Sequence, residues 1–279
     1  MSDLAQRRDD VVTPSQDDET RKVRYRGGGF SPKPRAFMAP IVFLVLVVIW
    51  EIGSHFGLIP PIVLPSPSEV FQALKDLVQS GLLWKHLSAS LYRLIIGFTC
   101  GTILGLAAGA LIGLWSYPRA ALRPLVAAIF PIPKIALLPL FIIWFGIGEG
   151  SKIATILFGS FFPTVIATYG GIDAVDRSLI NMGQSFNLSR WSIIRKIIFP
   201  SALPAILNGM RISASISIIL LVAAEMIGAE YGIGAYVLLA GNLMSTDQLI
   251  AGVILLSILG LIVSYLISLA EQYFLRWRR

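Results

Sequence analysis

Long runs of apolar residues, separated by short polar stretches, dominate the chain after its first 35 residues. Each run is close to the roughly 20 residues that a helix needs to cross a bilayer core. Lipid leaves unpaired backbone groups without partners, and runs of this length do not alternate as barrel strands do. The pattern therefore predicts an all-α integral membrane protein with about six transmembrane helices. We place them at about 38–57, 91–115, 122–147, 152–171, 204–228 and 248–272.

The first 35 residues form a region of their own. They are polar, carry charges of both signs and include a run of three glycines at 27–29. Such a segment cannot bury enough apolar surface to offset the entropy lost on ordering. The sequence therefore predicts a disordered polar and basic tail over residues 1–35 and a transmembrane domain over residues 36–279.

Lysines and arginines gather on alternate sides of the predicted spans. If the N-terminus is cytoplasmic, that side receives seventeen of them and the opposite side three. The seventeen are eight in the tail and Arg119, Arg123, Arg177, Arg190, Arg195, Lys196, Arg276, Arg278 and Arg279; the three are Lys75, Lys85 and Lys152. This bias is a strong positive-inside signal, so both termini are predicted to be cytoplasmic.

The composition agrees with a membrane protein and excludes several other classes. Hydrophobic residues make up 55% of the chain and charged residues 14%, with a mean hydropathy of +0.75. The net charge of +7 does not indicate nucleic-acid binding, because the basic residues lie at the ends of apolar runs. The single cysteine, Cys100, excludes an internal disulfide, and His55 and His86 are too isolated to form a metal site.

Two local patterns make specific structural predictions. Ser66-Pro-Ser-Glu69 is typical of a helix start, with a capping serine, a proline at the first helical position and a glutamate at the third. The second predicted span carries glycines at 97, 101, 105, 109 and 113. Positions four apart lie near one face of a helix, so these glycines predict a smooth ridge against which another helix packs.

The longest loop predicted to be cytoplasmic, residues 172–203, has the pattern of two short helices joined by a turn. Asp176 is suited to cap a helix from Arg177 to Phe186. Asn187 tolerates the left-handed backbone conformation that often follows a helix. The loop is therefore predicted to begin with a capped helix and a tight turn.

The second half of this loop predicts an amphipathic helix. Ser189 is suited to cap it, and Trp191, Ile194 and Ile198 share one of its faces. We expect Pro200 and Pro204 to end this helix before the fifth span. Such a helix pair, apolar on one side and basic on the other, fits either a groove on a partner protein or the membrane surface.

The same loop resembles the cytoplasmic coupling motif of ABC-importer permeases, E-A-A, three residues, Gly, then about a dozen residues to Leu-Pro. In this chain the Glu and both Ala of the motif are replaced, and its Gly is Asn. The positions that match the motif and its surroundings are Asn181, Met182, Gly183, Asn187, Ser189, Arg190, Trp191 and Pro200.

Further blocks narrow the resemblance. Residues 131–149, 64–70 and 222–229 look like the subgroup of permeases for nitrate, taurine and aliphatic sulfonates, and the similarity covers about residues 38–275. The resemblance implies a type I ABC importer permease-like fold in the bacterial inner membrane, surrounded by lipid. It also implies three protein partners: a cytoplasmic ABC ATPase dimer, an extracytoplasmic solute-binding protein and a second permease copy, expected to be identical. A small anion is the expected solute, although similar permeases import heterocyclic vitamin precursors.

Ionisable residues within the spans are candidates for the translocation path because they are costly in lipid. Lys134 follows two prolines that must disturb its helix, so it either attracts an anion or reaches the headgroups. Glu225 either gates the path or bonds neighbouring backbone. We expect Glu149 to be a solvated end position or to meet the delivery protein, and Arg93 to be an interface anchor. Arg211 either pairs with a carboxylate or, more easily, reaches the cytoplasmic headgroups.

Nothing in the sequence predicts catalysis. It contains no nucleophile–base pair, no metal-ligand spacing and no G-x-x-x-x-G-K-[ST] phosphate loop, so ATP hydrolysis is expected from a partner and no cofactor is predicted. The alternative function is a secondary transporter that works without an ATPase. Such proteins often have internal repeats and several carboxylates within the membrane, and this chain lacks a convincing repeat.

Overall fold

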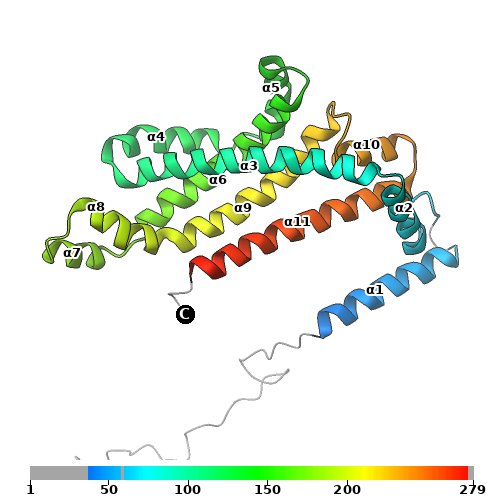
Figure 1. The fold of residues 1–279 in the computed structure, drawn as a ribbon, viewed down its shortest axis with the longest axis horizontal. Coiled ribbons are helices and arrows are strands. Elements are labelled where there is room, and N and C mark those ends of the chain that lie inside the picture. Colours follow the sequence, from blue (N-terminus) through cyan, green and yellow to red (C-terminus); the bar gives the residue numbers. More distant parts are fainter. Residues whose placement is uncertain (1–36, 58–59, 276–279) are drawn as a thin grey trace, which may run out of the picture. The chain divides into compact units, whose positions relative to one another are not determined.

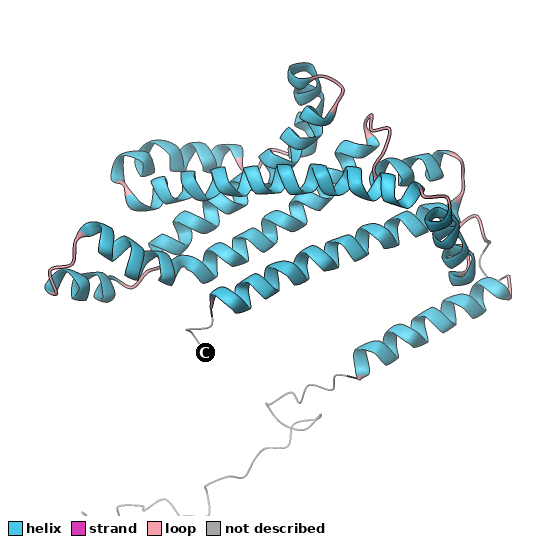
Figure 2. Cartoon of the chain, in the orientation of Figure 1, coloured by secondary structure: helices cyan, strands magenta, loops and turns pink. Residues whose placement is uncertain are grey.

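The computed structural model describes residues 37–57 and 60–275, and these residues form only helices and loops (Figure 2). The predicted tail, residues 1–35, lies outside the described residues. The chain divides into two compact units, Met1–Ile49 and Trp50–Arg279. The first unit contributes the N-terminal part of helix α1 (Met38–His55).

The second unit holds the rest of the fold, with α7 and α8 at one end and α10 near the other (Figure 1). Its elements after α1 are α2 (Pro67–Gln79), α3 (Leu82–Leu114), α4 (Ser116–Ile129), the 3-10 turn η2 (Lys134–Leu137), α5 (Leu138–Phe145), α6 (Glu149–Asp173), α7 (Arg177–Ser185), α8 (Arg190–Ile193), the π-helical turn η3 (Ile194–Ile198), α9 (Phe199–Met226), α10 (Ile233–Asn242) and α11 (Thr246–Phe274).

Four of the described helices are long and apolar enough to cross a membrane: α3, α6, the continuous stretch Arg190–Met226, and α11. A fifth span results if α4 and the η2–α5 segment, bent by 92° at their junction, are counted as one. The apolar part of α1, Pro40–His55, is shorter. The all-helical membrane prediction is confirmed, with four to five candidate spans where the sequence pattern predicted six.

The glycine ridge packs as predicted. All five glycines of α3 face α6, and a Cβ at Gly101 would lie 2.0 Å from Ser160 Oγ. At Gly109 it would lie 2.5 Å from Thr168 Cβ. Real side-chain carbons do not approach so closely, so glycine is what allows the two helix backbones to pack against each other.

The core of the unit is built around α6. One buried cluster joins Leu94, Ile156, Leu221, Ile233 and Leu259, which come from α3, α6, α9, α10 and α11. Buried hydroxyls on α6 and α9 are satisfied as well: Thr164 Oγ1 and Ser213 Oγ lie 2.8 Å apart. Because buried polar groups are costly unless they are paired, this bond also fixes the register of the two helices.

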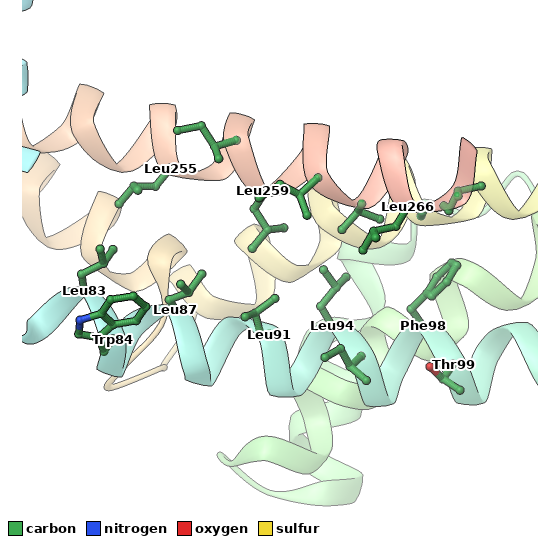
Figure 3. Close-up of a pocket in the computed structure, with 16 residues that line it drawn as sticks. Leu83, Trp84, Leu87, Leu91, Leu94, Phe98, Thr99, Leu255, Leu259 and Leu266 are labelled. Carbon is green, nitrogen blue, oxygen red and sulfur yellow. The ribbon is translucent and has the colours of Figure 1, made fainter. Parts of the chain in front are cut away.

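An apolar groove of about 460 Å³ separates α3 from α11 over much of their length. Leu87, Leu91 and Leu94 on α3 point toward Leu255 and Leu259 on α11 across it (Figure 3). These side chains suit hydrocarbon rather than water, as expected for helices that cross a membrane.

The capping prediction at the start of α2 is confirmed. Glu69 N donates to Ser66 Oγ at 3.2 Å, and Ser66 N donates to Glu69 Oε2 at 2.8 Å. Trp50 Nε1 donates to the Pro65 carbonyl at 3.0 Å, which holds the end of α1 next to this cap. The reciprocal bonds satisfy two backbone N–H groups that a helix start otherwise leaves unpaired.

The prolines have two different effects. Pro131 and Pro133 break the helix as predicted, because α4 ends at Ile129 and the chain turns sharply before α5. The prediction that Pro200 and Pro204 end a helix is wrong, since Arg190–Met226 is continuously helical. Pro200 lies in the first turn of α9, directly after η3. A local π-helical turn can re-pair backbone groups that a proline would leave free.

Candidate functional site: a coupling surface and a buried ion-pair cluster

The first half of the 172–203 loop folds around two caps. Asp176 Oδ1 accepts a hydrogen bond of 2.8 Å from Ser178 N, at the start of α7. This backbone bond lowers the pKa of the Asp176 carboxyl below its ordinary value, so the cap is charged at neutral pH. Its contribution is lost only as the pH falls through that lowered pKa. The helix ends at Ser185, one residue before the predicted end.

Asn187 adopts the left-handed conformation that the sequence predicted, with φ of +54°. Its N–H donates to the Gln184 carbonyl at 2.8 Å, and Leu188 N donates to the Gly183 carbonyl at 3.1 Å. These two bonds form a Schellman motif, which closes the C-terminal end of α7. Asn187 therefore forms the left-handed turn that the sequence predicted.

The second helix is capped by Ser189, whose Oγ accepts from Ser192 N at 3.3 Å. It packs against α7 at Gly183, where a Cβ would lie 2.8 Å from Ile197 Cδ1 and 3.4 Å from Ile193 Cγ1. Ile193 is buried in this contact. The two short helices therefore form one packed unit and not a flexible loop.

Large apolar side chains remain exposed on this unit. Phe186 is 74% exposed, Trp191 is 68% exposed and Met182 is 51% exposed. We call these three residues the coupling surface. Asn181 lies beside them on α7, where its carbonyl accepts from Ser185 Oγ at 3.0 Å. Exposed aromatic and Met side chains on a rigid helical support are typical of a protein-binding surface.

The structure gathers seven of the eight predicted coupling residues in α7, the turn and α8. Pro200 is the exception, because it lies farther along in the first turn of α9. Arg190 points toward the C-terminal end of α3, and its Nη2 lies 3.5 Å from the Leu114 carbonyl. Arg119 donates to the Ile112 and Gly113 carbonyls at the same helix end. Cations are favourable near the negative end of a helix dipole.

At the other end of the core, Arg93 lies at the centre of a buried ion-pair cluster. Its Nε and Nη2 donate to the two oxygens of Glu149 at 2.6 and 2.7 Å. Its Nη1 donates to Glu225 Oε1 at 2.8 Å and to the Tyr231 carbonyl at 2.7 Å. Arg93 is only 3% exposed, so the expectation of an interface anchor is wrong. The predicted span began at residue 91, whereas α3 begins at Leu82, which places Arg93 three turns inside the helix.

Glu225 is 1% exposed and fully paired. Besides Arg93, it accepts from Ser90 Oγ at 2.8 Å and from Gly234 N at 2.9 Å. Ser90 Oγ in turn accepts from Ile233 N at 2.9 Å. The expectation that Glu225 bonds neighbouring backbone is confirmed, and these bonds hold the first turn of α10 against α3 and α9.

Three further charged residues have partners within the chain. Glu149, whose side chain is 49% exposed, is not simply a solvated end position, because both of its carboxylate oxygens accept hydrogen bonds from Arg93. Lys152, predicted to be the first residue of the fourth span and counted on the outer side, is buried in α6 and donates to the Gly148 carbonyl at 2.9 Å. Arg211 Nη2 donates to Glu271 Oε2 at 2.6 Å, so the alternative in which it pairs with a carboxylate is confirmed.

Lys134 lies at the bend between α4 and α5. Its ammonium donates to the Phe130 carbonyl and lies 4.6 Å from the centre of the Phe130 ring and 5.7 Å from that of Phe162. No hydrogen bond or ion pair among the described residues joins Lys134 to Glu225. The two path candidates therefore have different partners in this structure.

Solved structures share the fold. Two inward-facing structures of the MetNI methionine ABC transporter match with TM-scores of 0.56 and 0.58, each at 22% identity. They cover 70% and 71% of this chain, and the match covers 95% and 96% of those chains. At this identity the likeness concerns the fold alone.

Several bacterial permease sequences have a higher identity to this chain than the two structures do. The Bacillus subtilis SsuC protein, assigned as an aliphatic sulfonates transport permease, is 36% identical over 84% of this chain and 85% of its own length. The taurine transport system permease protein TauC of Escherichia coli is 34% identical over 84% of this chain and 86% of its own. The riboflavin transport system permease protein RibX of Chloroflexus aurantiacus is 32% identical over 85% and 89%.

Residues 101–279 match the family model described as the binding-protein-dependent transport system inner membrane component. Systems of this kind work with an ATPase and a binding protein, which excludes the secondary-transporter alternative. The chain belongs to this family and is the multi-pass, non-catalytic permease subunit of an ABC importer in the inner membrane.

Proposed function

We propose that two identical copies of this chain form the pore of an importer for a small sulfonate such as taurine or a short alkyl sulfonate. Each copy docks its coupling surface on one subunit of a cytoplasmic ABC ATPase dimer, and an extracytoplasmic binding protein delivers the solute. The observation that carries the proposal is the coupling surface itself, with Phe186 and Trp191 exposed on a capped helix pair.

A docked role for this surface is favoured over a helix pair lying on lipid. Apolar side chains that insert into a membrane do not need a fixed mutual geometry, whereas those of a protein interface do. Here the geometry is fixed three times, by the Asp176 cap, by the turn at Asn187 and by the contact of Gly183 with Ile193 and Ile197. Large aromatic side chains of this kind dominate the binding energy of most interfaces.

The proposed topology has six spans with both termini cytoplasmic. The six are the four long helices, the bent α4–α5 pair and α1, whose 18 residues approach the length needed for a span. The distribution of lysines and arginines along the sequence supports this orientation. With it, the coupling surface faces the compartment that contains ATP.

The sulfonate class rests on the names of SsuC and TauC, both at least 34% identical to this chain. Lys134 supports an anionic solute, because it is a cation at a helix break within the apolar region. Glu225 has a different proposed role. Both of its carboxylate oxygens accept hydrogen bonds within the chain, from Arg93, Ser90 and Gly234, so it holds α10 in place instead of meeting the solute.

The proposal is tested by co-expressing the chain with its ATPase and binding protein and reconstituting the complex in liposomes. We expect ATP-dependent uptake of labelled taurine or ethanesulfonate that requires the binding protein. Trp191→Glu should abolish co-purification of the ATPase. Phe71→Glu is the matched control, since Phe71 is an exposed aromatic residue on α2 and lies away from the coupling surface.

Two results would contradict the proposal. If Trp191→Glu retained the ATPase in equal amount, the coupling surface would lie elsewhere. If the complex imported riboflavin but neither sulfonate, the solute class would be wrong while the importer mechanism would stand.

A further inference from the structure

The exposed side of α9 is unusual for a helix that crosses a membrane. Ser201, Ala205, Asn208, Ile212 and Ser215 follow one another at spacings of four and three residues and are all exposed. Residues at these spacings share one face of a helix. Apart from Ile212, the residues of this face between Ser201 and Ser215 are small or polar, although α9 has the composition of a transmembrane helix; the next position, Ile219, is again large and apolar.

The exposed side of α11 is a useful contrast. Leu261, Ile262, Leu266 and Leu269 are exposed there, and all are large and apolar. That surface suits lipid hydrocarbon. Since the two helices belong to the same unit, the difference indicates that α9 turns its exposed face toward something other than lipid.

Asn208 makes this argument specific. Its side-chain amide forms no hydrogen bond with any of the described residues. Nearby polar groups behave differently: Ser213 is paired with Thr164, and Ser217 Oγ donates to the Ser213 carbonyl at 2.8 Å. An amide without partners is costly in hydrocarbon, so Asn208 requires water or a ligand.

A cavity of about 380 Å³ lies directly at this residue. Asn208 and Ile212 line it from α9, Pro163 and Ile166 line it from α6, and Phe130 closes it from the end of α4. The volume is in the range of small-molecule sites, which are mostly apolar with a few placed polar groups. No carboxylate lines this cavity.

Lys134 supplies a charge at the rim of the cavity. Its ammonium contacts both the carbonyl and the ring of Phe130, which is one of the lining residues. An ammonium has three donors and an amide nitrogen has two, while a sulfonate presents three acceptor oxygens that share one negative charge. The apolar walls at Ile166 and Ile212 match the short carbon chain of such a solute.

We propose that this cavity is a binding site for the solute on its way through the pore, in which Lys134 and Asn208 hold the sulfonate group. Asn208 is then a specificity-determining residue, because its N–H donors recognise an oxyanion and form no hydrogen bond with the described residues of the chain. This inference rests on the proposed function, of which it specifies one site.

The first experiment tests the site without the ATPase. Because Cys100 is the only cysteine in the chain, Cys100→Ser gives a background for Asn208→Cys. Permeabilised membrane vesicles are treated with 2-sulfonatoethyl methanethiosulfonate or with its trimethylammonium counterpart. For Asn208→Cys, we expect the ratio of the anionic to the cationic labelling rate to be about tenfold higher than the same ratio for a free thiol. Ethanesulfonate should slow the labelling of Asn208→Cys.

Two further variants complete the labelling experiment. Leu261→Cys on the lipid-facing side of α11 is the matched control and should stay unlabelled. Adding Lys134→Gln to Asn208→Cys should remove the preference for the anionic reagent. Labelling of Leu261→Cys at an equal rate, or a thiol at position 208 that neither reagent reaches, would overturn the proposal.

The second experiment measures transport by the reconstituted complex. Asn208→Ala should lower the amount of ethanesulfonate moved per ATP hydrolysed about tenfold, because a hydrogen bond to a charged group is lost. ATPase stimulation by the binding protein should persist. Asn208→Asp should lower transport further, Lys134→Arg should retain it, and Ser257→Ala on α11 should match the wild type.

The remaining outcomes separate this site from the proposed function. If Asn208→Ala transports normally, or if Asn208→Cys instead cross-links two copies, the residue pairs between copies and the solute site is refuted. If the wild-type complex shows no ATP-dependent sulfonate uptake while labelling and protection at position 208 persist, the proposed function fails and the anion site remains.

Discussion

At the α10 end of the core, charged side chains lie buried and are satisfied within the chain, whereas at the α7–α8 end apolar side chains are exposed and have no contact that covers them. Arg93 and Glu225 have almost no exposed surface, and their side chains take part in six hydrogen bonds. Phe186 and Trp191 have most of their surface exposed on a packed support. One end is satisfied within a single chain, and the other is the surface that we propose to dock on the ATPase.

This difference shows how structural and functional residues are told apart in an apolar protein. An intramembrane charge is a reasonable functional candidate, but a charge whose hydrogen-bonding capacity is filled within the chain has nothing left for a ligand. An exposed side chain that the fold holds in a fixed position remains available to contact a partner. We therefore expect substitutions in the cluster to affect folding, and substitutions in the coupling surface to affect assembly.

The largest effect is expected for Arg93→Met. It leaves Glu225 as a buried carboxylate without its cation, which should lower the free energy of unfolding by about 3–5 kcal/mol. The measurement is thermal unfolding of the detergent-extracted permease. The triple variant Arg93→Met, Glu149→Gln, Glu225→Gln should recover part of the loss. Unchanged unfolding of the single variant would mean that the cluster does not support the fold.

The next effect concerns the coupling surface. Phe186→Glu should weaken binding of the ATPase by about 2 kcal/mol or more, roughly 30-fold, because Phe186 is the most exposed of the three large apolar side chains of the coupling surface. Thermal unfolding of the permease alone should stay at the wild-type value. A variant that is both unstable and fully assembled would reverse the roles assigned to the two ends.

Gly101→Ala tests the helix pair that connects the two ends. The new Cβ would lie 2.0 Å from Ser160 Oγ, so α3 and α6 must separate, with an expected loss of about 1–3 kcal/mol in stability. Gly170→Ala is the matched control, since nothing lies within 4 Å of the added carbon. It should be neutral or stabilising by up to about 1 kcal/mol. Equal effects of the two variants would argue against close packing at the ridge.

The smallest effect is expected at the turn of the coupling surface. Asn187 has φ of +54°, which glycine adopts freely and alanine does not. Asn187→Ala should destabilise the turn by about 1 kcal/mol, and Asn187→Gly should stabilise it slightly. Amide hydrogen exchange at Leu188, whose N–H closes the turn, measures this directly. Faster exchange in the glycine variant would contradict the assignment.

Local chemistry made the α7–α8 unit predictable from sequence. Asp176, Asn187 and Ser189 each act on backbone groups within a few residues, so their type and spacing were sufficient. The glycine ridge was predictable for a similar reason, because four-residue spacing on one helix defines a face. The identity of the facing helix, α6, was not, since no local pattern specifies a partner.

The ion-pair cluster could not be predicted, because its members lie far apart in the sequence. Arg93 and Glu225 are separated by 132 positions. An apolar run also gives only the hydrocarbon-like part of a helix, and α3 begins nine residues before the predicted span. That error moved Arg93 from the helix interior to an apparent interface. A partial signal existed, because an arginine and a glutamate within apolar runs of one chain are costly unless they pair.

The continuity of Arg190–Met226 gives the protein a lever. At 1.5 Å per residue, its 37 residues form an arm about 55 Å long, with Trp191 near one tip and Glu225 near the other. No loop interrupts the arm to absorb a displacement. If this stretch moved as a rigid body, a tilt of about 5° at the coupling surface would move the opposite tip by about 5 Å. A displacement of the α7–α8 end would thus be transmitted through the helix to the Arg93 cluster. No ligand would have to move between the two ends.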